Sequence, residues 1–138
     1  MKKPARSPKI SDTSGIRNLV VVLGDQLSCE LETFRSFDPK QDAVWMAESV
    51  IEAEYVWSHK QRIALFLSAM RHFRKELESR GIRVFYTELE KNQDPKGLDE
   101  LLEHFLKSKN VTGSVLMTEP GEWRLKKAFK DLATNITT

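Results

Sequence analysis

The stretch Leu19-Val20-Val21-Val22-Leu23-Gly24-Asp25 decides the fold, because a short apolar run ends abruptly in a glycine and a carboxylate. Comparable runs recur along the chain, and amphipathic helical stretches separate the later ones. We expect strands at 18–23, 43–47, 83–89 and 114–118. Unbroken apolar strands that alternate with helices are typical of a parallel sheet covered on both faces. The sequence therefore predicts an α/β fold, a Rossmann-like three-layer sandwich with a mostly parallel sheet of four strands.

The longest helix signal covers 52–80, where one apolar stripe recurs at helical spacing. Gly81 follows as a stop signal, since glycine readily adopts the left-handed backbone that ends many helices. The opposite face carries charged residues, among them Arg71 and Arg74, and is predicted to be mostly solvated.

Shorter patterns complete the outline of the chain. The segment 26–42 has apolar spacing for one or two helical turns, and amphipathic stripes predict helices over 97–109 and 122–133. The basic stretch 1–17 has no apolar core and is expected to be a disordered tail. The folded domain is therefore expected to cover 18–138.

The bulk composition narrows the class of protein. At 138 residues and a formal net charge of +2, the chain has room for one domain and gives no general argument for nucleic-acid binding. The single cysteine, Cys29, cannot form an internal disulfide, and no cysteine cluster could hold zinc or iron–sulfur. A reducing cytoplasm is the expected location. No run approaches the ~20 apolar residues that span a membrane, so no membrane partner is expected.

The pattern stops short of a fifth strand. A doubly wound sheet would receive one more strand after the helix at 122–133. The sequence supplies only Asn135-Ile136-Thr137-Thr138 there, so we expect a sheet truncated before its fifth strand, in a fragment or a shortened relative of a longer protein. The strand at 114–118 would then have an open edge, through which the chain can self-associate.

Ligands of parallel sheets gather at the carboxyl ends of the strands, and Gly24-Asp25-Gln26 is the best candidate there. A glycine lets the backbone approach a ligand, and the Asp25 carboxylate can accept from a ring N–H or a sugar hydroxyl. Alternatively, Asp25 and Gln26 only cap the following turn. The residues alone favour neither interpretation.

Two further stretches have both a functional and a structural interpretation. Glu52, Tyr55 and His59 are spaced by three and four, so they share one helical face that could bind a polar heterocycle. A solvated first turn of the helix is the more common explanation of that pattern. The segment 118–124 is constrained by a proline and a glycine, and Trp123 within it is expected to cover the sheet.

Other chemistry has no support in the sequence. Neither a Gly-x-Gly-x-x-Gly motif nor a phosphate-cradling Gly-x-x-x-x-Gly-Lys-Ser/Thr motif is present. No nucleophile–base pair and no third metal ligand beside Glu52 and His59 is evident. We therefore assign no catalytic residue and no metal site.

Three stretches taken together resemble a known family. They are Leu23-Gly24-Asp25-Gln26-Leu27, the segment 55–73 that begins Tyr55-Val56-Trp57-Ser58-His59, and Thr118-Glu119-Pro120-Gly121-Glu122-Trp123-Arg124. In order and spacing they are similar to the N-terminal domain of the deoxyribodipyrimidine photolyase-related proteins, the bacterial iron–sulfur cryptochromes and (6-4) photolyases. The resemblance covers about 18–132.

The resemblance implies an α/β antenna domain that binds the chromophore 6,7-dimethyl-8-ribityllumazine. In such proteins the chromophore passes excitation to FAD in a large helical domain, which also holds a 4Fe–4S cluster and the DNA-lesion pocket. Carried over by position, the implied chromophore contacts are Gly24, Asp25, Glu52, Tyr55 and Gly121.

The helical half implied by the resemblance is absent from this sequence. The expected function is therefore chromophore binding within a protein of light-driven DNA repair or blue-light sensing, without catalysis by this chain alone. FAD, the 4Fe–4S cluster and DNA would be partners only of the missing domain. The alternative is a stand-alone module that binds a nucleotide-like or flavin-like ligand, or another protein, without photochemistry.

Overall fold

The computed structural model describes residues 15–49, 60–89, 96–109, 111–121 and 123–136. The elements in chain order are β1 (Leu19–Val21), the 3-10 helix η1 (Glu32–Phe34), β2 (Ala43–Ala47), α2 (Lys60–Ser79), β3 (Val84–Thr87), α3 (Leu98–Ser108), β4 (Val115–Met117) and α4 (Trp123–Ile136). The first eight residues of the helix predicted at 52–80 lie outside the described residues.

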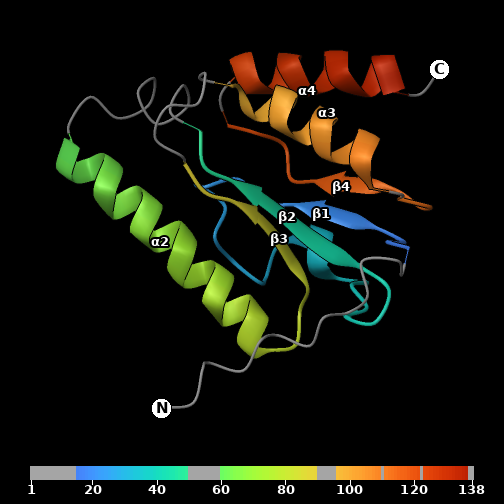
Figure 1. Ribbon diagram of the computed structural model, residues 1–138, viewed down its shortest axis with the longest axis horizontal. Helices are drawn as coiled ribbons and strands as arrows, with labels where there is room; N and C mark the ends of the chain where they lie inside the picture. The colour runs from blue at the N-terminus through green and yellow to red at the C-terminus, as the bar shows by residue number, and fades with distance from the viewer. Residues whose placement is uncertain (1–14, 50–59, 90–95, 110, 122, 137–138) are drawn as a thin grey trace.

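The four strands form one sheet in the order β3-β2-β1-β4, and every pairing is parallel. In the central register, Val20 of β1 lies beside Val44 of β2 on one side and Leu116 of β4 on the other. Helix α2 covers one face of the sheet, and α3 and α4 cover the other (Figure 1). The predicted three-layer α/β fold is confirmed, with an entirely parallel sheet.

Successive residues of β1 and β2 supply two separate cores because strand side chains alternate between faces. Toward α2, the cluster is Val20, Val22, Val44, Met46, Met70, Phe73 and Leu77. Toward α3 and α4, it includes Leu19, Val21, Trp45, Leu102, Phe129 and Leu132. The unbroken apolar runs of the sequence are thus buried from both sides.

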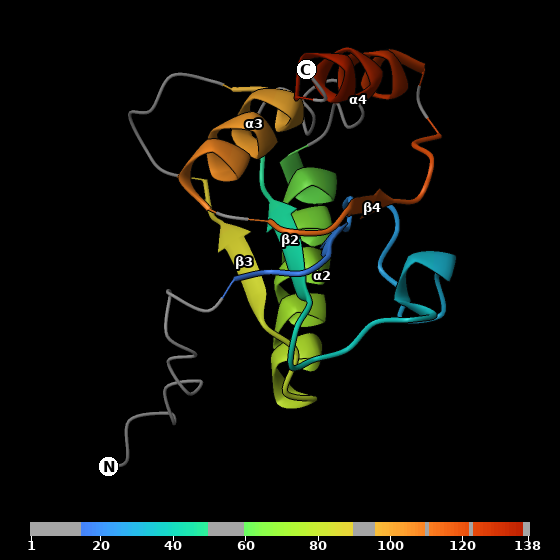
Figure 2. The same cartoon turned by 90° about the vertical axis from the view of Figure 1, so that its right-hand side faces the viewer.

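The 3-10 helix η1 covers the part of the sheet that α2 leaves free. Figure 2 shows α2 running along β2 and β3, with η1 set to the side beneath β4. Phe34 and Phe37 pack against the cluster on the α2 face, as does Leu116 of β4. The prediction of a short helical turn within 26–42 is confirmed as one 3-10 turn.

Helix α2 ends as its sequence predicts. Gly81 has a φ of 78°, in the left-handed region that favours glycine. The amide of Ile82 donates to the Leu77 carbonyl at 3.1 Å, and the amide of Gly81 donates to the Glu78 carbonyl at 3.0 Å. These two bonds satisfy carbonyls that the helix end would leave unpaired, and they turn the chain toward β3.

The fold begins before residue 18. Ile16 is buried and bridges to Val111, while the Arg17 guanidinium donates to both oxygens of the buried Asp42 at 2.8 and 2.7 Å. The amides of Asn18 and Asp38 also donate to that carboxylate. Burial favours a higher pKa of Asp42, but these donors outweigh it and lower the pKa.

The predicted tail, residues 1–17, therefore includes two residues of the folded domain. Ile16 and Arg17 belong to the folded domain, and residues 1–14 lie outside the described ones. The basic composition concealed this boundary, because Arg17 is the charge partner of a buried carboxylate 25 residues later.

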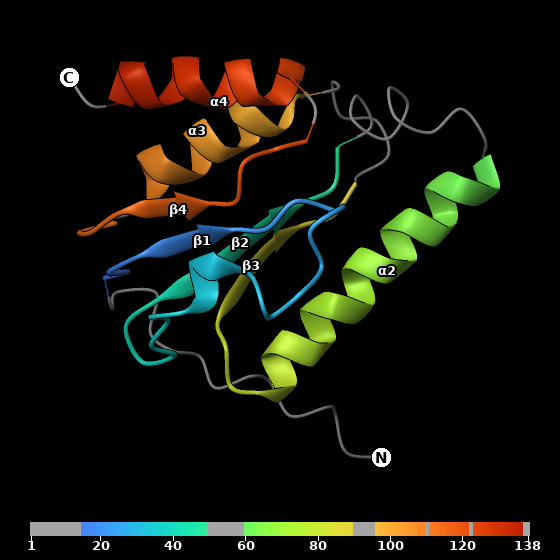
Figure 3. The ribbon, with the colours of Figure 1, turned by 180° about the vertical axis from the view of Figure 1, so that it is seen from behind.

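Strand β4 lies at one edge of the sheet, as the sequence predicts. It pairs with β1, and in the described part of the chain no strand lies on its other side (Figure 3). Val115 is 40% exposed there. A groove of about 680 Å³ follows this edge, lined mainly by β4, α3 and α4, with Leu106, Met117 and Phe129 among its apolar residues. Self-association through the edge stays a prediction.

The helices were also compared with the length and hydropathy that a membrane crossing requires. Within the described ranges, none combines sufficient length with sufficient apolar character.

Candidate functional site

The strand order places a topological switch point between β1 and β4. The chain proceeds from β1 through β2 to β3 on one side and then returns to add β4 on the other. In open α/β sheets, ligands bind at the carboxyl ends of the strands beside such a point. Here residues 24–26 follow the carboxyl end of β1, and residues 118–121 follow the carboxyl end of β4. We call these two segments the switch point.

The side chain of Gln26 joins the two halves of the switch point. Its Nε2 donates to the carbonyl of Thr118 at 3.2 Å and to the carbonyl of Glu119 at 3.3 Å. Its backbone amide donates to the Leu23 carbonyl at 2.9 Å, which closes a turn after β1. The backbone N–H of Gln26, and not its side chain, therefore closes the turn. The side-chain oxygen Oε1 is buried and has no donor in the described structure.

The two glycines of the predicted site have different surroundings. A Cβ atom added to Gly24 would overlap the ring of Phe66 on α2, so the missing side chain lets this helix approach the end of β1. At Gly121, such a Cβ has no described atom within 4 Å apart from those of the glycine and its chain neighbours. Free space beside the backbone, which a ligand needs, is therefore found at Gly121.

The remaining predicted contacts are placed only in part. Asp25 is exposed in the turn after β1, beside Gln26. Glu52 and Tyr55 lie outside the described residues. The structure thus brings Gly24, Asp25 and Gly121 to the carboxyl ends of two neighbouring strands, β1 and β4.

Trp123 does not cover the sheet, and that expectation is wrong. It is 71% exposed at the start of α4. The buried residues of α4 are Leu125, Phe129 and Leu132. Two residues correspond to about 200° of helical rotation, so Trp123 lies on the side opposite Leu125.

A buried carboxylate lies at the carboxyl end of β2. The Glu48 side chain is 0% exposed, and Arg71 on α2 donates from Nε to Oε2 at 2.7 Å and from Nη2 to Oε1 at 2.9 Å. The Tyr86 hydroxyl donates to Oε2 at 2.5 Å, and the Leu89 amide donates to Oε1 at 3.0 Å. Four donors thus compensate for the loss of water around one carboxylate.

The electrostatics of this cluster are set by competition between burial and hydrogen bonding. Burial favours a higher pKa of Glu48, but the bonds from Arg71, Tyr86 and Leu89 outweigh it and lower the pKa. For Tyr86, burial and the adjacent Glu48 carboxylate both raise the pKa. Glu48 is therefore charged and Tyr86 neutral at neutral pH.

Sequence reasoning missed this cluster because it treated one face of α2 as solvated. Arg71 is bound to Glu48, and Arg74 lies 5.0 Å from the centre of the Tyr86 ring while it pairs with Glu78 and Glu88. A detectable signal was Glu48 itself, which directly follows five buried residues, since a carboxylate buried together with them needs a cation.

The end of β2 also holds both ends of the segment 90–95. Leu89, before the segment, is bound to Glu48 as described. The Ser49 hydroxyl donates to the carbonyl of Lys96, after the segment, at 2.8 Å. The exits of β2 and β3 are thereby fixed to each other.

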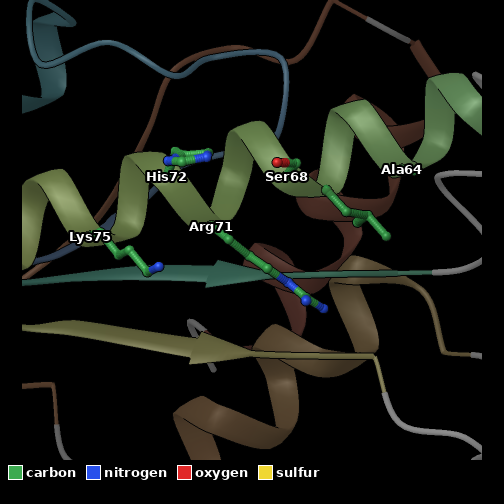
Figure 4. A pocket seen from close by; sticks show the side chains of 6 residues that line it. Ala64, Ser68, Arg71, His72 and Lys75 are labelled. Atoms are coloured by element: carbon green, nitrogen blue, oxygen red, sulfur yellow. The ribbon is translucent and has the colours of Figure 1, made fainter.

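An open pocket of about 390 Å³ runs along α2, and Figure 4 shows side chains that line it. The lining residues follow one stripe of the helix, and from it Arg71 extends toward the strands, where it is bound to Glu48. These polar groups do not converge on one point, so the pocket has no built ligand site. Nor do three potential metal ligands gather anywhere in the described ranges.

Comparison with known proteins relates the sequence to one family. The profile of the family described as "Deoxyribodipyrimidine photo-lyase-related protein" matches residues 20–138. A (6-4) photolyase from Agrobacterium fabrum is 38% identical over 116 residues, which are 83% of this chain. The matched part is 22% of that relative, so the chain spans about a fifth of its length.

Proposed function

Because the chain belongs to the family of deoxyribodipyrimidine photo-lyase-related proteins, we propose that it is an antenna domain that binds a light-absorbing heterocycle at the switch point. The observation that carries the proposal is the pair of exits from β1 and β4. They join through Gln26, and they leave free space beside Gly121. The chromophore we propose is 6,7-dimethyl-8-ribityllumazine, which absorbs violet-blue light and passes on the excitation.

The chemistry of the switch point suits this ligand. The exposed Asp25 carboxylate can accept hydrogen bonds from ribityl hydroxyls or from a ring N–H. Gly121 lets a planar ring approach the backbone. Gly24 supports the site indirectly, since it admits Phe66 and so fixes α2 beside β1. Glu52 and Tyr55 are proposed as further contacts.

The photochemical role belongs to a longer protein. The chain matches 22% of the (6-4) photolyase. We propose that lesion repair or blue-light sensing takes place in a longer protein, with FAD and a 4Fe–4S cluster in a further domain. For this chain we propose capture and orientation of the chromophore. Asp25 would bind the ribityl chain, and the backbone at Gly121 would limit the position of the ring.

The direct test is purification from a host that synthesises riboflavin. A yellow, fluorescent ligand should accompany the protein, and denatured extracts should yield the lumazine in near-stoichiometric amount. Titration of the ligand-free protein with lumazine, riboflavin and a nucleotide then separates the antenna from a general nucleotide-like or flavin-like binding module. Protein that carries no lumazine and takes none up in titration contradicts the proposal for this chain.

Variants locate the site. Glu52→Ala and Tyr55→Phe should each raise the lumazine dissociation constant several-fold, since a lost hydrogen bond costs about 0.5–1.5 kcal/mol. Glu76→Ala, at an exposed position on α2 that pairs with Arg80, is the matched control and should bind as the wild type does. Equal affinities for all four proteins would place the ligand elsewhere.

A further inference from the structure

We propose that the edge of β4 and the groove beside it form a docking site for an extended segment of another polypeptide, with apolar residues at alternate positions and one acidic residue. The inference goes beyond the proposed function and does not depend on it. Three observations support it, namely the side of β4 on which no described strand pairs, the apolar lining of the groove and the positive charge at its rim.

The backbone of β4 offers hydrogen-bonding groups on its outer side. The Ser114 carbonyl accepts from the Leu19 amide of β1 at 2.9 Å. Backbone groups of successive strand residues point to opposite sides, so the N–H and C=O groups of Val115 and Met117 point away from β1. No described strand pairs with them there. An added extended segment suits such a row of groups, because it brings donors and acceptors at the same spacing.

The side chains of the same two residues line the groove. Val115 and Met117 both border it, whereas Leu116 between them packs against the cluster on the α2 face. The groove therefore lies on the other face of the sheet, where Figure 2 shows α4 on the side of β4. Leu106 of α3 and Phe129 of α4 extend its apolar lining. A strand paired with β4 would direct every second side chain into this space, so those side chains should be apolar.

The rim of the groove carries a net positive charge. Its lining includes one carboxylate, Glu119, and two ammonium groups, Lys126 and Lys130. Lys126 forms an ion pair with Glu119 and lowers the pKa of that carboxyl, and the charge of Lys130 lowers it further. Lys130 lies one helical turn after Lys126, is exposed and forms no ion pair with a described residue. One ammonium group is thus left over, and a carboxylate of the occupant complements it.

An extended acidic segment satisfies all three features, and two other occupants do not. A small apolar acid would fill the groove and neutralise Lys130, but it would leave the outer N–H and C=O groups of Val115 unpaired. The β4 edge of a second copy would pair with these groups, but the stretch 114–118 contains no carboxylate for Lys130. A second copy is therefore the weaker occupant, which a suitable peptide should displace.

The test measures the fluorescence anisotropy of a labelled peptide of about seven residues, with valine or leucine alternating with threonine and one aspartate in the apolar set. The wild type should bind it saturably. Lys130→Glu should weaken binding about fivefold, and replacing the aspartate of the peptide by lysine should restore the affinity of this variant. Lys127→Glu is the matched control, since Lys127 is an exposed lysine of α4 that does not line the groove.

Backbone pairing has a readout of its own. In an extended peptide every second amide faces the edge of β4. Methylation of the amide nitrogens of that set should weaken binding at least about tenfold, whereas methylation of the alternate set should change the affinity no more than about twofold. These comparisons use the wild-type chain throughout. In sedimentation, excess unmethylated peptide should convert any dimer formed through the edge to monomer.

Each contrary result has a distinct meaning. Absence of saturable binding by the wild type overturns the inference, as do equal losses in Lys130→Glu and Lys127→Glu, which would reflect overall charge alone. Equal effects of the two methylation patterns would show an apolar ligand that does not pair with β4. A dimer that excess peptide fails to dissociate would assign the edge to a second copy. Lumazine titration is a separate measurement, so the proposed function stands or falls independently of these outcomes.

Discussion

Glu48 and Arg71 form a bidentate ion pair in which only the Glu48 side chain is buried. The Glu48 side chain at the end of β2 is 0% exposed, whereas the Arg71 side chain on α2 is 46% exposed. Water can solvate Arg71 if it loses its partner, but it cannot reach Glu48. The pair is therefore asymmetric, and removal of the arginine should be the more damaging change.

Replacement of Arg71 by alanine should destabilise the protein by about 3–5 kcal/mol, since a buried carboxylate then lacks its charge partner. Arg80→Ala is the matched control, because Arg80 forms an exposed pair with Glu76 on the same helix. That loss should cost only about 0.3–0.5 kcal/mol. Urea unfolding of the three proteins measures both values. Equal losses for the two variants would show that Glu48 finds other compensation.

Acid should weaken the fold through Glu48. Its pKa in the folded protein lies below the ordinary value of 4.5, so the stabilisation it provides is complete above pH 4.5 and is lost as pH falls through the folded value. Glu48→Gln should be less stable than the wild type at about pH 7, and the two stabilities should converge as pH falls through the lowered pKa of Glu48. Parallel curves of unfolding free energy against pH would exclude Glu48 as a source. Asp42, whose pKa is also lowered, should supply the decline that remains in the variant.

Replacement by alanine should destabilise the protein at one glycine of the switch point and leave it almost unchanged at the other. In Gly24→Ala the new methyl group meets the Phe66 ring, and overpacking of this kind costs about 1–3 kcal/mol. In Gly121→Ala the methyl group enters free space, so stability should stay within about 0.5 kcal/mol. Thermal unfolding measures both changes. Adding Phe66→Leu should restore part of the loss in Gly24→Ala, and failure to do so would place the clash elsewhere.

The open edge of β4 should mediate self-association. No described strand pairs with the outer side of β4, so its backbone groups and the exposed Val115 can pair with the same edge of a second copy. Sedimentation should show a concentration-dependent dimer that Val115→Lys abolishes, because a charge at an edge disfavours strand pairing. Leu65→Lys makes the same change at an exposed leucine of α2, distant in sequence, and should leave the dimer intact. A wild type that stays monomeric throughout would contradict this use of the edge.

The sequence predicted the elements whose cause is local. Strand β2 was expected at 43–47 and is found there, because five consecutive apolar residues need burial on both faces. The end of α2 was predicted because a left-handed turn favours glycine at position 81. Strand β1 is shorter than expected. Val22 and Leu23 are buried, but they lie beyond the three residues of β1 that pair with β4.

What could not be predicted depends on contacts between distant residues. Arg71 and Tyr86 lie 23 and 38 positions after Glu48, and nothing in the helical or strand periodicity indicates that they meet. The same holds for Gln26 and Thr118, which are 92 positions apart. Part of the candidate site, the exits of β1 and β4, was predictable from strand order alone. The bridge between them required the three-dimensional arrangement.

The bonds that hold Leu89 and Lys96 to the end of β2 make the segment 90–95 a natural point for insertion. Each anchor acts on a residue outside the segment, so neither depends on how much chain lies between them. Doubling the length of a loop costs only about 0.6 kcal/mol in closure entropy. A peptide tag or a fluorescent reporter spliced between these anchors should leave the register of the sheet unchanged, which makes this position a practical place for labelling the domain.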